Sequence, residues 1–225
     1  MRHTSFTAFL LLGTLLMAAV MLYAGGARSI PAWKRLAAAV ILAVAGLAGA
    51  KLMAYIESGS FSGRSFFGAV FFVPLILWPT ALALRIPPKD MLDISAPAEC
   101  VMLALLKVDC AIEGCCRGRE LGIAQDGTIL RFPSQITECV AAMVLMLVLL
   151  WFLQRETSRG KIYFWYLVLY GATRFVLNLF RETEPFVWGL SAGNFWALIA
   201  LLLGGAGLWW FHRLERRRAV DDEIQ

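Results

Sequence analysis

The sequence predicts an all-α integral membrane protein, a single membrane domain over residues 1–225 with about seven transmembrane helices. Two observations predict this class. Apolar residues make up 60% of the chain and the mean hydropathy is +0.69, which exceeds what is usual for a soluble domain. These residues also gather in blocks of about 20, the length that spans the hydrocarbon core of a bilayer. The two features together indicate that lipid is the solvent of this fold.

The first three predicted spans lie at about 6–24, 36–56 and 65–84. Pro31 separates the first two, the Gly/Ser-rich stretch 58–63 separates the next two, and Pro87-Pro88 follow the third. The first block also resembles a secretory signal peptide, because Ala-Gly-Gly follows it. We expect an uncleaved first helix, since further apolar blocks follow at once.

Four more spans are predicted at about 96–113, 137–153, 161–179 and 190–211. The gap between the first two of these, residues 114–136, is the longest in the chain. Its segment 121–131 is typical of a small hairpin that turns at Asp126-Gly127. We expect this hairpin on the extracytoplasmic side.

The basic residues predict the orientation of the spans. With the C-terminus inside, the inner segments hold twelve Lys and Arg residues and the outer segments six. Basic residues favour the cytoplasmic side, so we expect the N-terminus outside and the C-terminus inside. The net charge of +5 is therefore explained by membrane orientation, and we expect no nucleic-acid partner.

Three basic residues, Lys51, Lys107 and Arg174, fall inside predicted spans. Each costs about 2.5–3.5 kcal/mol to insert at the centre of a membrane helix, so each needs a structural or functional reason. Under the predicted orientation all three lie in the outer part of their spans. The ionisable groups of the membrane domain are therefore expected near one face of the bilayer.

The sixth span carries a polar stripe. Tyr166, Tyr170, Arg174 and Asn178 recur four residues apart and therefore share one helical face, which Arg181 extends. Such a stripe faces protein or a water-filled cavity. One interpretation is a structural seam in which Arg174 pairs with Glu138 or Asp109. The other is an anion site, in which Arg174, Lys107 and Lys51 hold a lipid phosphate.

The five cysteines do not predict a disulfide framework. The Cys110-x4-Cys115-Cys116 spacing differs from the usual zinc spacing and has no nearby histidine, so we expect no metal site. The alternatives are inert buried thiols or a thiol made reactive by Lys107 or Arg117. Because the only histidines lie in the terminal segments, a general base in the outer cavity would be a carboxylate. The carboxylates considered are Glu57, Asp109, Glu113 and Glu138.

Three stretches resemble one known family. Arg131-Phe-Pro-Ser-Gln-Ile-Thr-Glu138 is similar to the Arg-His-Pro-Ser-Gln-Leu-Tyr-Glu motif of prolipoprotein diacylglyceryl transferases. Tyr170-Gly-Ala-Thr-Arg174 with Leu179-Phe-Arg-Glu182 resembles that family's Tyr-Gly-x-x-Arg and Phe-Phe-Arg-Glu segments, and Gly189-Leu-Ser191 resembles the start of its last helix. The resemblance covers about 60–195 and implies seven spans with the N-terminus outside.

The family's signature, Gly-Arg-Ile-Gly-Asn-Phe-Ile-Asn-Gly-Glu-Leu-Trp-Gly, falls on residues 106–118. Ile112, Gly114 and Gly118 match it, and Lys107 stands in place of the arginine. Cys110 and Cys115 replace an amide and a carboxylate. Phe67 occupies the position of a family histidine.

The resemblance implies transfer of diacylglyceryl from phosphatidylglycerol, or a related anionic phospholipid, to a cysteine of a lipoprotein precursor. It implies a bacterial cytoplasmic-membrane enzyme that uses no cofactor. Arg174 and Lys107 would stabilise the departing phosphate and Glu138 would orient an arginine. Together with the charge pattern, it predicts the following substrate-binding residues: Lys51, Cys110, Gly114, Gly118, Arg131, Ser134, Gln135, Tyr170 and Arg181.

Two other functions remain alternatives at the level of sequence. One is a non-catalytic lipid-binding or lipid-transporting protein, which the replacement of the histidine by Phe67 would suit. The other is a membrane enzyme that depends on Cys110, Cys115 or Cys116.

Overall fold

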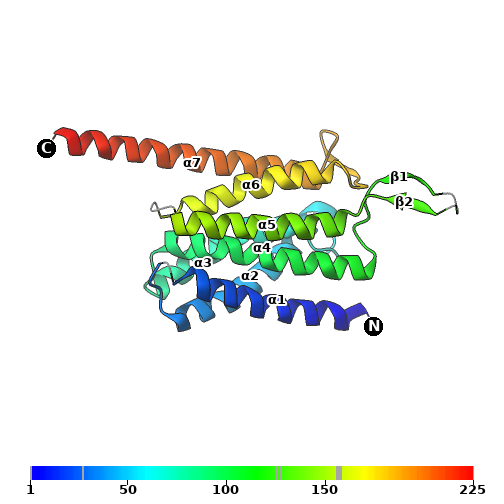
Figure 1. The fold of residues 1–225 in the computed structure, drawn as a ribbon, viewed down its shortest axis with the longest axis horizontal. Helices are drawn as coiled ribbons and strands as arrows, with labels where there is room; N and C mark the ends of the chain where they lie inside the picture. The colour runs from blue at the N-terminus through cyan, green and yellow to red at the C-terminus, as the bar shows by residue number, and fades with distance from the viewer. Residues whose placement is uncertain (1, 27, 125, 127, 156–158, 225) are drawn as a thin grey trace.

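The computed structural model describes residues 2–26, 28–124, 126, 128–155 and 159–224. These residues form seven α-helices and two short hairpins (Figure 1). The helices are α1 (Arg2–Ala24), α2 (Ala32–Ser58), α3 (Phe66–Ala83), α4 (Pro88–Glu113), α5 (Ser134–Arg155), α6 (Lys161–Asn178) and α7 (Ala192–Ile224). The strands are β1 (Glu120–Ile123), β2 (Ile129–Arg131), β3 (Pro185–Val187) and β4 (Leu190–Ser191).

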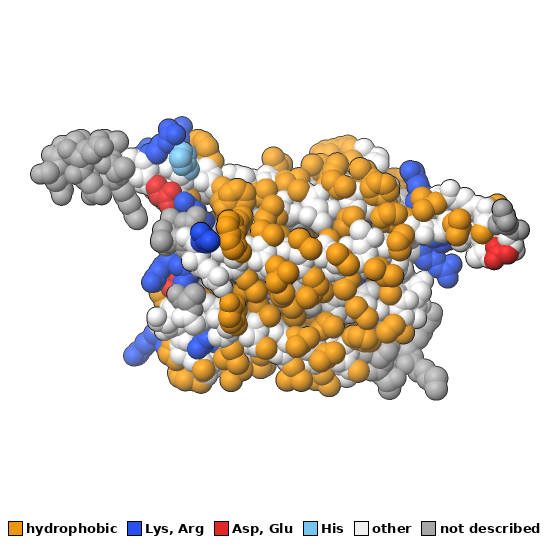
Figure 2. Space-filling model, in the orientation of Figure 1, with side chains coloured by type: hydrophobic (Ala, Val, Ile, Leu, Met, Phe, Trp, Pro, Cys, Tyr) orange, Lys and Arg blue, Asp and Glu red, His pale blue; other side chains and the backbone are white. Residues whose placement is uncertain are grey.

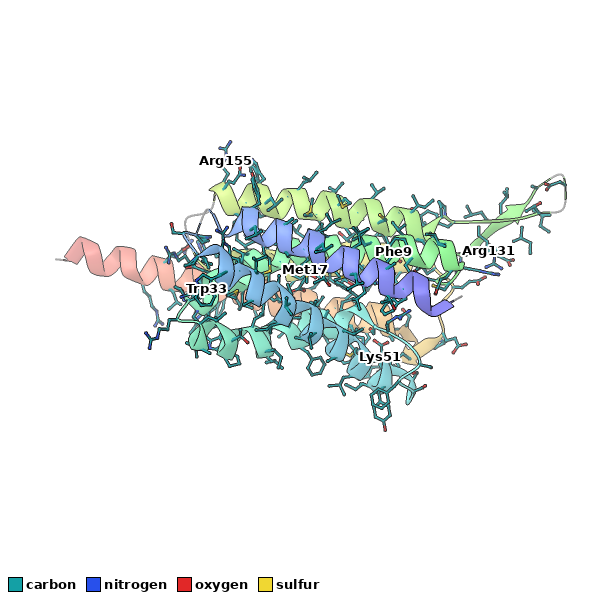
Figure 3. The ribbon with its side chains drawn as sticks, turned by 90° about the horizontal axis from the view of Figure 1, so that it is seen from below. Phe9, Met17, Trp33, Lys51, Arg131 and Arg155 are labelled. Atoms are coloured by element: carbon teal, nitrogen blue, oxygen red, sulfur yellow. The ribbon has the colours of Figure 1, made fainter. Side chains whose placement is uncertain are left out.

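The helices lie side by side along the long axis of the molecule (Figure 1). Helix α4 is central and packs against α1, α3, α5 and α6, while α7 covers α6. The start of α1 and both hairpins lie at one end, which we call the hairpin end, and the C-terminus lies at the other (Figure 1). Seen from below, Lys51 and Arg131 lie toward the hairpin end, and Trp33 and Arg155 lie toward the opposite end (Figure 3).

An apolar belt covers the middle of the bundle on the face seen in Figure 2. Hydrophobic side chains cover the sides of the helices there, and the charged side chains gather toward the two ends. Among the described residues, five helices are long and apolar enough to cross a membrane: α1 from Phe6, α2, α3, α5 and α7 as far as Arg217. The mostly helical, polytopic membrane architecture predicted from the sequence is therefore supported. Helix α4 carries most of the buried polar groups among the described residues, including Asp93, Glu99 and Lys107.

Helix α4 starts earlier than the predicted span, at Pro88 rather than near residue 96. A proline fits the first helical position because its missing N–H has no partner there anyway. The additional turns carry Asp93, whose carboxylate accepts the backbone N–H groups of Gly160 at 2.7 Å and Ile162 at 3.0 Å. Asp93 thus caps the start of α6 from a different helix, which anchors α6 at the end opposite the hairpins.

Helices α2 and α3 approach each other closely at two glycines. A Cβ atom on Gly68 would lie 1.9 Å from the carbonyl oxygen of Gly49. Small residues at such contacts allow the two backbones to meet, which is the usual packing device of membrane helices.

Two hairpins extend the hairpin end. The predicted hairpin is present as the antiparallel pair β1–β2, and Asp126 accepts the backbone N–H of Thr128 at 2.9 Å in its turn. Gly127 of the predicted turn lies outside the described residues. The second pair, β3–β4, was not predicted. It turns through Trp188 and Gly189, which both have positive φ, as the tightest hairpin turns require.

Candidate functional site

Four charged side chains meet inside the bundle near the hairpin end, and we call them the cation cluster: Lys107, Glu138, Arg174 and Arg181. Lys107 comes from the last two turns of α4 and Glu138 from the second turn of α5. The Nζ atom of Lys107 lies 2.6 Å from Oε2 of Glu138, and Nη1 of Arg174 contacts the same oxygen. Nη1 of Arg181 lies 3.3 Å from Oε1. None of these side chains is more than 15% exposed.

The cation cluster contains three cations and one carboxylate, so its net charge is +2. Buried charges are costly unless they are paired, and a single carboxylate cannot neutralise three cations. The Nε atoms of Arg174 and Arg181 are also buried without a hydrogen-bond partner among the described residues. The cluster is therefore suited to bind an anion.

The predicted polar stripe of α6 does face the interior. Tyr166, Tyr170 and Asn178 are all buried, and the rings of Tyr166 and Tyr170 stack with centroids 5.7 Å apart. Arg174 pairs with Glu138, as expected for a structural seam. Because Lys107 and Arg181 converge on the same carboxylate, the seam also has the positive charge expected of an anion site.

The loop after α4 is fixed against the end of α6, which positions Arg181. Helix α4 ends at Gly114, whose φ of +66° is the left-handed conformation that favours glycine. Gly118 bridges to Arg181, and the N–H of Arg119 donates to the Phe180 carbonyl at 2.9 Å. A Cβ atom on Gly118 would lie 2.0 Å from the carbonyl oxygen of Phe132, so only glycine fits this crossing.

Ser134 and Gln135 hold this loop from the start of α5. The Ser134 hydroxyl donates to the Cys116 carbonyl at 2.8 Å, and the Gln135 amide donates to the Cys115 carbonyl at 2.6 Å. Both side chains are therefore engaged by the loop backbone. They position the two cysteines beside the cation cluster.

Three thiols gather at the end of α4. The Sγ atoms of Cys110, Cys115 and Cys116 all lie within 4.8 Å of one another. A hydrogen bond from Cys110, together with the positive charges of Lys107 and Arg181, lowers the pKa of Cys116 to about 5. Burial instead raises the pKa of Cys115. The surroundings of Cys116 therefore favour its thiolate form.

A cavity of about 620 Å³ joins these groups. Its polar part includes Lys107, Arg174, Arg181 and the three thiols, together with Arg64 and the carboxyl groups of Glu57, Glu99, Asp109 and Glu184. Met17, Leu42 and Val73 line its apolar part. A molecule with an anionic head and an apolar body matches this division of the lining.

Phe67 also lines the cavity, but its ring packs into the core. It is 3% exposed, and its ring centroid lies 5.3 Å from that of Tyr170. The side chain at this position has no atom that accepts a proton. Glu57 lines the same cavity and accepts a hydrogen bond from the Ser65 hydroxyl at 2.7 Å.

Two predicted site residues lie apart from the cation cluster. The guanidinium of Arg131 pairs with Glu120 at 2.6 Å and with Glu182 at 2.8 Å, so it ties the β1–β2 hairpin to the segment after α6. Lys51 does not line the cavity, and its Nζ atom donates to the Phe61 carbonyl at 2.7 Å (Figure 3).

Sequence reasoning did not identify Glu99 as a site residue. This carboxyl group lines the cavity from α4, is 2% exposed, and has no hydrogen-bond partner within the described part of the chain. The sequence does contain a signal for Glu99, because an acidic residue inside an apolar span is costly and uncommon.

Comparison with known proteins places this geometry in context. A sequence model of the family described as prolipoprotein diacylglyceryl transferase matches residues 4–210. The chain is 31% identical over 163 residues to the phosphatidylglycerol–prolipoprotein diacylglyceryl transferase of Polaromonas sp. strain JS666, an alignment that covers 66% of this chain and 59% of that protein.

Two further relatives carry the same name. The protein of Polaromonas naphthalenivorans is 30% identical, with 69% of this chain and 63% of the relative covered. The protein of Coxiella burnetii strain RSA 331 is 27% identical, with 69% and 64% covered. The chain thus spans about 59% to 64% of the length of these curated relatives.

Proposed function

The chain belongs to the prolipoprotein diacylglyceryl transferase family, and we propose that it transfers diacylglyceryl from phosphatidylglycerol to a cysteine of a lipoprotein precursor. One observation carries this proposal. The three cations of a buried cluster with a net charge of +2 line a cavity that also has an extended apolar wall. A phospholipid presents the complementary arrangement, an anionic phosphate joined to two acyl chains.

The cation cluster supplies the electrostatic part of the proposed reaction. When the acceptor thiol attacks the glyceryl carbon, negative charge develops on the departing glycerol phosphate. Arg174 and Lys107 are the proposed catalytic cations, because both line the cavity and are held before substrate arrives. Preorganised donors of this kind commonly account for factors of about 10²–10³ in rate each.

Glu138 is the proposed positioning residue of the cluster. Its two oxygens contact all three cations, so it fixes the directions in which their remaining donors point. Arg181 is proposed to bind the phosphate alongside Arg174. Gly114, Gly118, Ser134 and Gln135 act through the loop that carries Cys115 and Cys116, and Tyr170 supports Arg174 from the preceding helical turn.

Arg131 and Lys51 are proposed to act at the periphery of the substrate path. Arg131 stabilises the β1–β2 hairpin through Glu120 and Glu182. Lys51 lies toward the same end of the molecule, where a cation favours approach of an anionic phospholipid (Figure 3).

The proposed setting is the bacterial cytoplasmic membrane. We propose that residues 1–225 form one domain with seven spans, with the N-terminus and both hairpins outside and the C-terminus inside. The apolar belt and the distribution of Lys and Arg support this orientation. The reaction centre would then lie at the depth of the outer headgroups.

The experiment that tests the proposed function uses purified protein in detergent. It would receive a peptide with a lipobox cysteine and phosphatidylglycerol labelled in its diacylglyceryl part, which is the part transferred. We expect label on the peptide thiol, and none on the same peptide with serine in place of cysteine. If the folded protein binds phosphatidylglycerol without transferring any label, the transferase function is wrong and a lipid-binding role replaces it.

A further inference from the structure

The local backbone conformation holds the thiols of Cys110, Cys115 and Cys116 together. Helix α4 delivers Cys110 in its last turn, and Gly114 then reverses the chain in a left-handed conformation. Cys116 itself has a positive φ of 57°, which is uncommon for a residue with a side chain. The N–H of Cys115 donates to the Cys110 carbonyl at 3.1 Å. Gln135 and Ser134 donate to the carbonyls of Cys115 and Cys116.

The spacing of the sulfurs fits a thiophilic metal ion after a small contraction. Zinc–sulfur bonds are about 2.3 Å long, so tetrahedral geometry places bound sulfurs about 3.8 Å apart. The three Sγ atoms already lie within 4.8 Å of one another. Side-chain rotations that move the sulfur atoms by a few tenths of an ångström to about 1 Å close this difference.

The group also leaves a fourth position open. All three cysteines line the 620 Å³ cavity, so an ion held between them faces the space in which a substrate would bind. Structural zinc sites use four protein ligands, whereas catalytic sites use three and leave the fourth to water or substrate. Three thiols at the wall of a cavity belong to the second type.

We propose that Cys110, Cys115 and Cys116 bind a zinc-like divalent cation whose open position takes the thiol of the acceptor cysteine. This inference rests on the proposed transferase function and adds to it the group that activates the nucleophile. The resemblance to the family implies no cofactor, so the site is a property of this chain's own residues. It fills the role left open by Phe67, which cannot accept a proton.

The chemistry balances without a side-chain base. Binding to the cation deprotonates the acceptor thiol, and its proton passes to solvent. The sulfur electron pair then forms a carbon–sulfur bond with the glyceryl carbon that bears the phosphate. The bond between that carbon and the phosphate oxygen breaks, and its electrons leave with glycerol phosphate. The cation stays on its three cysteines.

The charges of the surroundings match the loaded site. A divalent cation with three protein thiolates and one acceptor thiolate has a net charge of −2. The three cations of the cation cluster line the same cavity, and with Glu138 the cluster has a net charge of +2. The same cations therefore face both the bound thiolate and the phosphate that it displaces.

The first experiment measures metal binding in the absence of lipid and peptide. Reduced, metal-stripped protein would be titrated with Co²⁺, which stands in for Zn²⁺ and gives sulfur-to-cobalt charge-transfer absorption. We expect one equivalent bound, with the absorption reduced by at least a third in Cys110→Ser, Cys115→Ser and Cys116→Ser. The matched control is Cys139→Ser, which removes a thiol outside the group and should leave the absorption unchanged. No binding to folded protein, or equal loss in the control, overturns the site.

A second measurement uses only the wild-type protein, so it does not require any variant to fold. Alkylation of the wild-type protein with a maleimide, followed by peptide mass spectrometry, would be compared with and without Zn²⁺. Protection of Cys110, Cys115 and Cys116 by at least tenfold supports the site, provided that Cys139 stays reactive. Equal labelling of all these cysteines in both samples overturns it.

The last step tests the open position and separates this inference from the proposed function. A lipobox peptide added to the Co²⁺-loaded protein should raise the charge-transfer absorption, and its serine analogue should not; no change with either peptide overturns the acceptor role. If metal-stripped protein transfers diacylglyceryl from phosphatidylglycerol at an undiminished rate, the metal inference is wrong and the transferase function stands. A cobalt site that responds to the peptide in a protein without transfer activity preserves the site and overturns the transferase function.

Discussion

The Nζ atom of Lys107 lies 2.6 Å from the Oε2 atom of Glu138, in the interior of a helical bundle with an apolar outer surface. Arg174 contacts the same oxygen and Arg181 the other one. Three helices and a loop are therefore joined through one carboxylate, and the joint has more positive than negative charge.

Glu138→Gln should destabilise the protein and abolish transfer. The substitution leaves three buried cations without their carboxylate, and breaking a buried pair in this way costs about 3–5 kcal/mol. Thermal unfolding in detergent measures the loss. The control is Glu120→Gln, which removes a half-exposed partner of Arg131 and should cost under about 1 kcal/mol. Equal losses in the two variants would contradict the central place of Glu138.

Arg174→Ala should reduce turnover by about 10²-fold or more, because a preorganised cation at the departing phosphate is removed. Arg155→Ala is the matched control. That arginine lies at the opposite end of the bundle, where it faces the ring of Trp151 (Figure 3). Turnover of the control should stay within twofold of wild type. Comparable losses would argue against the assignment of the cavity.

Lys107→Arg should keep most of the activity, and Lys107→Met should lose it. The guanidinium of arginine preserves the charge and adds a second donor for phosphate, whereas methionine removes the charge and leaves a similar volume. The informative measurement is turnover at saturating phosphatidylglycerol, with binding of the lipid measured separately. If Lys107→Met retains wild-type turnover, Lys107 is structural only.

The sequence predicted the composition of the site better than its geometry. The four-residue spacing of Tyr166, Tyr170, Arg174 and Asn178 fixes a shared helical face, so its inward direction could be inferred. The predicted depth in the membrane does not distinguish Lys107 from Lys51. The two lie on different helices, and only packing decides which of them faces the cavity.

The loops account for most of what could not be predicted. The proximity of Cys110 to Cys116 depends on the left-handed turn at Gly114, and a Cys-x4-Cys-Cys spacing does not reveal it. The β3–β4 hairpin was missed because its strands are only three and two residues long, too short for an alternating pattern. Arg131 was predicted to bind substrate because of its motif, and the sequence did not reveal its ion pairs with Glu120 and Glu182.

Gly118→Ala should destabilise the hairpin end and reduce turnover. The new Cβ atom would lie 2.0 Å from the Phe132 carbonyl oxygen, so the crossing that positions Arg181 must open. Overpacking of this kind typically costs about 1–3 kcal/mol. Gly122→Ala is the control, because a Cβ atom there meets nothing within 4 Å. Thermal unfolding and turnover of the two alanine variants should therefore differ, and identical behaviour would contradict the close crossing.

Asp93→Ala should lower stability while leaving the chemistry of the folded protein unchanged. Asp93 accepts the N–H groups of Gly160, Ile162 and Tyr163 at the start of α6 and also contacts Arg28 at 3.4 Å. Loss of a helix cap costs about 0.5–2 kcal/mol. The buried backbone N–H groups that lose their acceptor add to this cost.

Asp93, on α4, contacts the start of α6, whereas Arg174 lies near the other end of α6, so the substitution loosens the start of the helix without touching the cation cluster. The measurement is turnover per folded molecule at a temperature well below the unfolding midpoint, paired with the midpoint itself. We expect a lower midpoint with turnover within twofold of wild type. A large loss of turnover at an unchanged midpoint would mean that Asp93 acts on the reaction and that the cap at the start of α6 is not its main role.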